Sequence, residues 1–402
     1  MTAGDPGECG GPLAGLRVIE MGQLIAGPFC GQLLGDMGAE VIKIEPPGHG
    51  DQMRNWGRGA KALWWEVIAR NKKSVSIDLR SGEGQALARR LIATADIMIE
   101  NFRPGTIEKW GMSPAALHAD NPRLIITRMS GYGQTGPYAD RAGFGLIGEA
   151  MGGWRYVVGE PDRPPSRMGI SIGDSLCATY GCLGALAALR HRDISGKGQV
   201  VDSSLYESVL QVMESLVIDY SVSGYVRERT GAILPGIAPS NVYRCKDGEF
   251  LIGANQDSVF ARLCAAMGDP DLAADPRYAT HIARGCNQVE LDRRIEAWTS
   301  ERTVDEVDAV MVAHGIPAGR MYRAPDMLVD PQFAARRSIV EVDHPRFGPI
   351  SMQNVFPLLS ETPGRIRSLA PAKPGEHNRQ ILGDVLGLDD AEIDRLAQVG
   401  VI

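Results

Sequence analysis

Residues 16–45, LRVIEMGQLIAGPFCGQLLGDMGAEVIKIE, decide the fold. Arg17–Met21 is a short apolar run that predicts a strand, and the glycine-containing turn 22–27 follows it. Pro28 stands where a helix favours proline, and Gly38 stands where a helix ends. The apolar run 41–44 then predicts a second strand. Strand, helix and strand in this order indicate a βαβ unit, and therefore a parallel sheet.

The same alternation continues outward from this unit. We expect helices at 83–95, 106–118, 175–191 and 203–222, with strands at 97–99, 124–127 and 199–201. The fold class predicted is therefore α/β, with a large Rossmann-like parallel-sheet domain.

The pattern changes near residue 225. Two short apolar runs, 242–245 and 249–252, flank a glycine-containing turn and predict a hairpin. Helices are expected at 256–267, 288–299 and 303–313, and a final helical pair at 376–386 and 389–398 could pack back on the first domain. We predict a large domain of residues 1–224 and 335–402, and a small α+β domain of residues 225–334.

The composition and charge of the chain argue against several classes of function. The net charge of −7 argues against nucleic acid as the main partner. The uncharged stretch 175–189 is short of the about 20 residues of a membrane span, which favours a core helix. Residues 1–12 lack the basic and apolar regions of a signal peptide, and the seven scattered cysteines suggest reduced thiols in the cytoplasm. No metal-ligand spacing of His and Cys occurs, so we expect no metal site.

Four local motifs each allow a structural and a functional interpretation. The turn 22–28 is either a plain turn or an anion-binding helix start. The basic run 70–74 is either a solvated surface or a phosphate-binding segment. Asn101-Phe102 is either part of a turn or a surface for an adenine ring or a pantetheine chain. Asp174 is either a helix N-cap or a covalent nucleophile.

Six motifs follow one another along the chain: A-G-P (26–28), G-A-E-V-I-K-I-E (38–45), R-N-K-K-S (70–74), E-N-F-R-P-G (100–105), S-G-Y-G-Q-T-G-P (130–137) and G-D-S (173–175). In this order and spacing they resemble the class III CoA-transferases (CaiB/BaiF type), and the resemblance runs from about Leu13 to the C-terminus. Within that family, the stretch 141–174 and the segment 234–241 look like the bacterial succinyl-CoA-dependent enzymes that act on malate, citramalate or itaconate.

The resemblance implies a set of site residues. The family's catalytic aspartate falls on Asp174, and its first turn, here Leu24 and Ile25, would lie beside the thioester. The implied CoA contacts are Ile77 (through its backbone), Arg80, Asn101, Phe102 and Lys109, with Tyr132 in a loop that lines the same pocket.

Two departures from formyl-CoA transferase stand out. This chain has Pro46 in place of an arginine beside the adenine, and Ile25 in place of a glutamine near the acyl group. A rival within the fold is an α-methylacyl-CoA racemase, which uses a histidine base where this chain has Phe144. Phenylalanine cannot move a proton, which favours transfer. A non-catalytic CoA-binding protein is a further alternative.

The implied reaction exchanges one thioester for another through aspartyl anhydride and aspartyl-CoA intermediates. It requires CoA thioesters as substrates and no tightly bound cofactor. A dicarboxylate acceptor needs a cation for its second carboxylate, and Arg167 is our candidate. The resemblance also implies an interlocked homodimer, with neither nucleic acid nor membrane as a partner.

Overall fold

The computed structural model describes residues 10–58 and 62–402, so most of the N-terminal lead-in, including Cys9, lies outside the described residues. The chain forms two compact units. The first comprises Met1–Trp154, Met168–Val217 and Arg336–Ile402, and the second comprises Arg155–Arg167 and Ile218–Ala335. The predicted small domain began at residue 225, whereas the second unit begins at 218 and also takes in residues 155–167.

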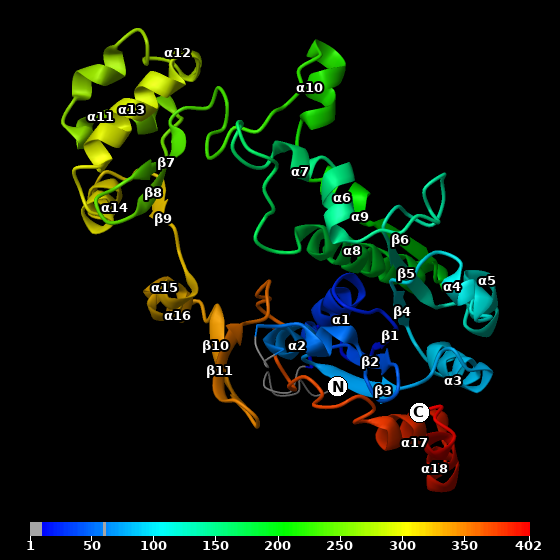
Figure 1. The fold of residues 1–402 in the computed structure, drawn as a ribbon. Helices are drawn as coiled ribbons and strands as arrows, with labels where there is room; N and C mark the ends of the chain where they lie inside the picture. The colour runs from blue at the N-terminus through cyan, green and yellow to red at the C-terminus, as the bar shows by residue number, and fades with distance from the viewer. Residues whose placement is uncertain (1–9, 59–61) are drawn as a thin grey trace. The chain divides into compact units, whose positions relative to one another are not determined.

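The first unit is built on a six-stranded parallel sheet with the strand order β3-β2-β1-β4-β5-β6 (Figure 1). This is the doubly wound order, in which strand order reverses between β1 and β4. The predicted α/β fold with a parallel sheet is confirmed. The strands are β1 (Arg17–Glu20), β2 (Glu40–Glu45), β3 (Lys72–Ser76), β4 (Ile97–Glu100), β5 (Ile125–Ser130) and β6 (Val200–Ser204).

Helices cover both faces of this sheet. The helices of the first unit are α1 (Ala26–Asp36), α2 (Leu63–Ile68), α3 (Gly82–Ala93), α4 (Thr106–Lys109), α5 (Pro114–Asp120), α6 (Gly145–Met151), α8 (Ile172–Ser195), α9 (Leu205–Leu210), α17 (Asn378–Leu386) and α18 (Asp390–Gln398), with the 3-10 turn η1 (Gln52–Asn55). Two short helices, α7 (Trp154–Val157) and α10 (Leu216–Ser223), begin in the first unit and continue into the second.

Alternation along the strands sorts side chains between two cores. Val18 and Val41 belong to the core formed with α1 and α8, whereas Ile19 and Ile42 belong to the core formed with α3, α17 and α18. Neighbouring residues of a strand point to opposite faces, so one apolar run serves both layers. The expected return of the C-terminal helices to the first domain is confirmed.

Two predicted helices are broken. The helix expected at 106–118 is split into α4 and α5, because Gly111 has a φ of +72° and Ser113 starts a new helix by accepting a hydrogen bond from the Ala116 N–H. The helix expected at 203–222 is split into α9 and α10, and Glu214 between them has a φ of +54°.

Helix α8 is, within the described residues, long and apolar enough to cross a membrane by length and composition. Its apolar residues Cys177, Ala178 and Ala185 are instead buried against the sheet, in the same core as α1. One side of the helix therefore belongs to the core, as predicted, whereas Leu183 and Ile194 on the same helix are exposed. The helix is also longer than the stretch 175–191.

The second unit carries the predicted hairpin. Strands β7 (Ser240–Arg244) and β8 (Glu249–Gly253) pair antiparallel, and β9 (Ala318–Arg320) adds a third strand to β8. Its helices are α11 (Asp257–Met267), α12 (His281–Cys286), α13 (Gln288–Thr299), α14 (Val304–Ala313), α15 (Ala324–Val329) and α16 (Pro331–Ala335), with the 3-10 turn η2 (Pro270–Ala274).

The C-terminal segment of the first unit packs along β3, one of the two edge strands of the sheet. Strands β10 (Ile339–His344) and β11 (Gly348–Gln353) form a hairpin, and the chain then runs along β3. The Ser74 N–H donates to His377 Nδ1 at 3.1 Å, and the His377 N–H donates to the Ser74 carbonyl at 2.9 Å. An edge strand covered in this way does not present a row of unpaired backbone N–H and C=O groups with which a strand of another chain could pair.

Candidate active site at the carboxyl edge of the sheet

A cavity of about 200 Å³ opens where the loops after β1, β4 and β5 meet the start of α8. In doubly wound sheets, ligands bind at the carboxyl ends of the strands, where the strand order reverses, and β1 and β4 flank that point here. The lining residues are Gln23, Leu24, Ile25, Ala26, Asn101, Phe102, Met129, Ser130, Gly131, Gly143, Phe144, Asp174 and Leu205.

Asp174 supplies the carboxylate of this cavity. It lies in the first turn of α8, three residues after the N-cap Ser171, so the helix N-cap interpretation is wrong. Burial raises the pKa of Asp174 from its usual value near 3.8 to about 6, and the nearby Glu149 carboxylate adds to the rise. At neutral pH the group is therefore mostly ionised, but poorly solvated, and a poorly solvated carboxylate is a better nucleophile than a hydrated one.

Two glycines permit this placement of Asp174. A Cβ atom on Gly145 of α6 would collide with the Asp174 carboxylate, and a Cβ on Gly173 would lie 2.8 Å from the Gly145 carbonyl oxygen. Helices α6 and α8 can approach each other here only because neither residue has a side chain. Gly145 and Glu149 are not among the residues predicted from the sequence, in which the G-F-G pattern at 143–145 is a signal for a close approach.

Asn101 joins the loops after β1 and β4. Its Oδ1 accepts a hydrogen bond from the Gln23 N–H at 2.8 Å, and its Nδ2 donates to the Gln23 carbonyl at 2.8 Å. The side-chain amide that was expected to contact CoA therefore has backbone partners on both of its polar atoms. Asn101 lines the cavity and fixes its wall.

A second cavity, of about 350 Å³, adjoins the first. Gln23 and Phe102 line both cavities, so the two share a wall. The other residues of the second cavity are mostly apolar and include the predicted contacts Ile77 and Arg80. The remaining residues that line the second cavity are Met21, Ile44, Glu45, Pro46, His49, Asp78, Leu79, Thr106 and Trp110.

Phe102 is held at the boundary between the two cavities. Its ring meets Trp110 edge to face with centroids 5.1 Å apart, and its N–H donates to the Glu100 carboxylate at 2.7 Å. Arg80, by contrast, leaves its side chain 81% exposed beside Asp78. A half-buried aromatic face with an exposed cation nearby suits a ligand with a flat apolar part and an anionic part.

Three predicted site residues do not line these cavities. Lys109 is exposed at the end of α4. Tyr132 packs edge to face on Tyr138, with ring centroids 5.9 Å apart, behind the cavity residue Gly143. Arg167 belongs to the second unit and is exposed there.

Two of the three cations in the basic run 70–74 fit neither predicted interpretation. Arg70 is buried and pairs with Asp36 at 2.6 Å, and Lys72 is buried and pairs with Glu20 at 2.7 Å. Lys73 pairs with Glu40 at the surface. The two buried cations, Arg70 and Lys72, are therefore held by carboxylates inside the fold, and neither is at a solvated surface or in the open position that a phosphate site requires.

Phe144 lines the Asp174 cavity and is 67% exposed. The position that carries a histidine base in the racemases therefore holds an apolar side chain at the cavity mouth. A racemase needs proton-transfer groups on both sides of the substrate, and Phe144 supplies none.

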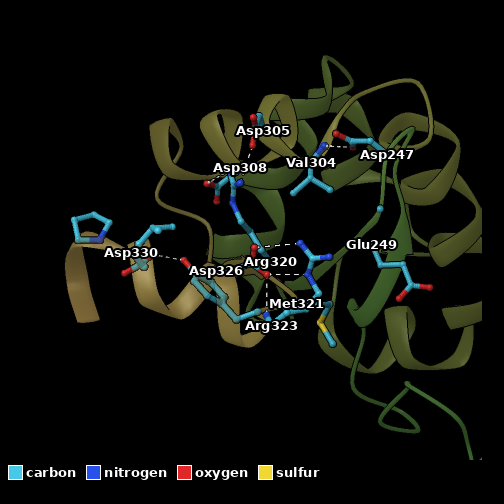
Figure 2. Close-up of a pocket in the computed structure, with 14 residues that line it drawn as sticks. Asp247, Glu249, Val304, Asp305, Asp308, Arg320, Met321, Arg323, Asp326 and Asp330 are labelled. Carbon is cyan, nitrogen blue, oxygen red and sulfur yellow. Dashed lines mark hydrogen bonds and ion pairs between the residues drawn. The ribbon is translucent and has the colours of Figure 1, made fainter. Parts of the chain in front are cut away.

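The second unit has a larger cavity of its own, of about 860 Å³ (Figure 2). Several aspartates line this cavity, and an arginine of the same lining neutralises part of their charge. Arg320 pairs with Asp305 at 2.7 Å and with Asp308 at 3.1 Å. Arg323 likewise pairs with Asp326 at 3.0 Å. None of the residues predicted to act in catalysis or CoA binding lines this cavity.

The sequence as a whole matches a known family. A family model described as CoA-transferase family III matches residues 13–378. The succinyl-CoA–D-citramalate CoA-transferase of Chloroflexus aurantiacus is 58% identical over 395 residues, covering 97% of this chain and 98% of the relative. The beta subunit of succinyl-CoA–L-malate CoA-transferase from the same organism is 43% identical over 399 residues, covering 97% and 98%.

Solved structures agree with this match. A CaiB/BaiF family protein from Brucella suis has a TM-score of 0.81 and 36% identity, over 96% of this chain and 100% of the other. The protein Rv3272 from Mycobacterium tuberculosis has a TM-score of 0.81 and 30% identity, over 92% and 98%.

Proposed function

The chain belongs to CoA-transferase family III, and on that premise we propose that it moves CoA from succinyl-CoA to a small dicarboxylic acid through Asp174. Relatives named for D-citramalate, L-malate and glutarate all pair a succinyl or succinate group with a second dicarboxylate. Citramalate is the first acceptor to test, because the relative that shares 58% of its residues is named for it. Itaconate and malate follow.

One observation carries the proposal. The Asp174 carboxylate lies in a small cavity that shares the wall residues Gln23 and Phe102 with a larger apolar cavity. A CoA thioester with its nucleotide in the larger cavity would extend its pantetheine arm past Phe102 and bring its carbonyl carbon to Asp174. Holding nucleophile and carbonyl in one small space supplies much of the rate of such a reaction.

The first half of the reaction releases succinate. The Asp174 carboxylate attacks the carbonyl carbon of succinyl-CoA, the C–S bond breaks, and a mixed anhydride and the CoA thiolate form. The thiolate then attacks the Asp174 carbonyl carbon of the anhydride. The C–O bond to the succinyl group breaks, which leaves an aspartyl-CoA thioester and free succinate.

The second half repeats these steps with the acceptor. A carboxylate of the acceptor attacks the aspartyl thioester and displaces the CoA thiolate, which gives a new anhydride. The thiolate attacks the acceptor's carbonyl carbon, and Asp174 leaves as a free carboxylate. Each bond that breaks is replaced by one of the same kind, so the cycle consumes no proton and needs no tightly bound cofactor.

The second carboxylate of the acceptor requires a cation. The residues that line the Asp174 cavity in the described part of the chain include neither arginine nor lysine. We therefore keep Arg167 as the proposed partner, since a guanidinium binds a carboxylate through two parallel hydrogen bonds. The contacts of CoA with Arg80, Lys109 and Tyr132 also remain proposals.

We also propose the interlocked homodimer. Apolar side chains that include Ile194 on α8 and Val222 on α10 are 71% and 81% exposed. Extensive exposed apolar surface is typical of protein interfaces. The cytoplasmic location expected from the cysteines stays a prediction.

A substrate panel tests the proposal. Succinyl-CoA is offered with D- and L-citramalate, L-malate, itaconate, mesaconate or glutarate, and acyl-CoA products are separated by chromatography. We expect one acceptor to be preferred, and Asp174→Ala to lower turnover by several orders of magnitude while CoA still binds. Turnover near the wild-type rate in Asp174→Ala contradicts the assignment. Exchange of an α-proton of an acyl-CoA with solvent deuterium, without CoA transfer, would indicate the racemase instead.

A further inference from the structure

The loop 22–25, which forms one wall of the Asp174 cavity, has an unusual backbone. Leu24 has a φ of +63°, a conformation that residues with a side chain rarely adopt. Leu24 and Ile25 both line the cavity, so the strained residue lies where a thioester would bind. A strained backbone persists only where its surroundings hold it in place.

Side chains hold the backbone of this loop at successive residues. Lys43 Nζ donates to the Gly22 carbonyl at 2.8 Å. Asn101 binds both the N–H and the carbonyl of Gln23. The Leu24 N–H donates to the two carboxylate oxygens of Asp51, at 3.1 and 3.3 Å. Two of these three side chains, Lys43 and Asp51, line neither cavity.

Lys43 and Asp51 also form a buried ion pair. Their charged groups are 2.8 Å apart and each side chain is 1% exposed. Burial opposes the charge on both. Nevertheless, the carboxylates of Asp51 and Glu20 hold the pKa of Lys43 above its usual value, and Lys43 keeps the pKa of Asp51 low.

A buried ion pair is a weak source of stability, because desolvation offsets much of the attraction between its charges. Such a pair does fix the positions of its two charged groups. Here the same two groups also fix the backbone of the loop, since Lys43 binds one of its carbonyl oxygens and Asp51 binds one of its N–H groups.

We propose that Lys43 and Asp51 are positioning residues for the transfer reaction. Through the Gly22 carbonyl and the Leu24 N–H, they hold the loop 22–25 in the conformation that places Leu24 and Ile25 against the thioester beside Asp174. The inference rests on the proposed function for its kinetic part. The geometric part, that Asp51 holds the Leu24 N–H, stands independently of any substrate.

Asp36 provides the matched control. Like Asp51 it is a buried aspartate in the first unit and forms a buried ion pair, with Arg70 at 2.6 Å. It lies at the end of α1 opposite to the loop and lines neither cavity. Asp36→Asn therefore reports what the loss of a buried ion pair does without any change at the loop.

The experiment compares Asp51→Asn, Asp51→Ala and Asp36→Asn. For each we measure kcat and KM with succinyl-CoA and the preferred acceptor, CoA affinity by calorimetry, thermal unfolding, and backbone hydrogen exchange of the segment 22–29. Asn can still accept a hydrogen bond from the Leu24 N–H, and Ala cannot. Asp51→Ala is expected to lower kcat roughly 10- to 100-fold, Asp51→Asn less, and both should change CoA affinity by less than about threefold.

Hydrogen exchange at the Leu24 amide should become faster in Asp51→Ala and stay unchanged in Asp36→Asn. A kcat loss in Asp51→Ala no larger than that in Asp36→Asn, or unchanged exchange at Leu24 in Asp51→Ala, would overturn the proposal. If Asp51→Ala does not fold, Asp51→Asn decides: loss of the charge weakens the bond to the Leu24 N–H, so exchange there should be faster than in the wild type, and unchanged exchange with a wild-type kcat would overturn the proposal. If the wild type transfers no CoA, the proposed function fails, and the exchange measurement still tests the positioning of the loop.

Discussion

Replacing Asp174 by asparagine should make the protein more stable at alkaline pH while it abolishes CoA transfer. Burial and Glu149 raise the pKa of Asp174 to about 6 from its usual value near 3.8. A rise of this size means that the ionised form costs about 3 kcal/mol in the folded state. Water at the partly exposed carboxylate reduces that cost, so we expect a gain of about 1–3 kcal/mol for Asp174→Asn.

The size of this gain in stability depends on pH. Below pH 4 the carboxyl group is mostly protonated in both states, and the charge costs little. As the pH rises from 4 to 6 the unfolded chain ionises first, so the wild type loses stability. Above pH 6 the full cost is present. Asp174→Asn should therefore gain most at pH 8 and less than about 1 kcal/mol at pH 4.

Thermal unfolding at pH 4 and pH 8 measures this difference. We expect the melting temperature of Asp174→Asn to exceed that of the wild type by roughly 2–6 °C at pH 8. Asp193, exposed on the same helix, is the matched control, and Asp193→Asn should stay within about 0.5 kcal/mol of the wild type at both pH values. A mutant no more stable than the wild type at pH 8, or equally stabilised at both pH values, would refute the reasoning.

Three further predictions concern the same carboxylate. In the wild type, kcat/KM should rise about tenfold per pH unit up to about pH 6 and level off above it, because only ionised Asp174 attacks. Glu149→Gln should move that transition to lower pH, and an unmoved transition would exclude Glu149 as a cause. Gly145→Ala should lower turnover about 100-fold or more, since its methyl group would occupy the space of the Asp174 carboxylate. Gly82→Ala, which adds a methyl group in open space on α3, is the control, and equal activity of the two variants would show that Gly145 is not needed.

The parallel sheet could be predicted because its signals are local, whereas the local sequence at Asp174 also fitted a helix N-cap. Residues 16–45 contain a complete βαβ unit, and its apolar runs and breakers lie next to one another in the chain. The family resemblance then pointed to one aspartate, and the structure gives that residue a cavity of its own.

The surroundings of Asp174 could not be predicted, because they come from packing between distant segments. Glu149 and Gly145 reach Asp174 only because α6 lies against α8. The burial of Arg70 and Lys72 in the basic run 70–74 could not be predicted for the same reason. Their partners Asp36 and Glu20 lie more than thirty residues away, and the C-terminal segment that covers β3 comes some 300 residues later.

The central claim is that Asp174 becomes covalently acylated during CoA transfer. The most direct test incubates the protein with succinyl-CoA, adds hydroxylamine and identifies the modified peptide by mass spectrometry. We predict a hydroxamate on Asp174 that depends on succinyl-CoA and is absent from Asp174→Asn. CoA transfer at the full rate with an unmodified Asp174 peptide would contradict the account.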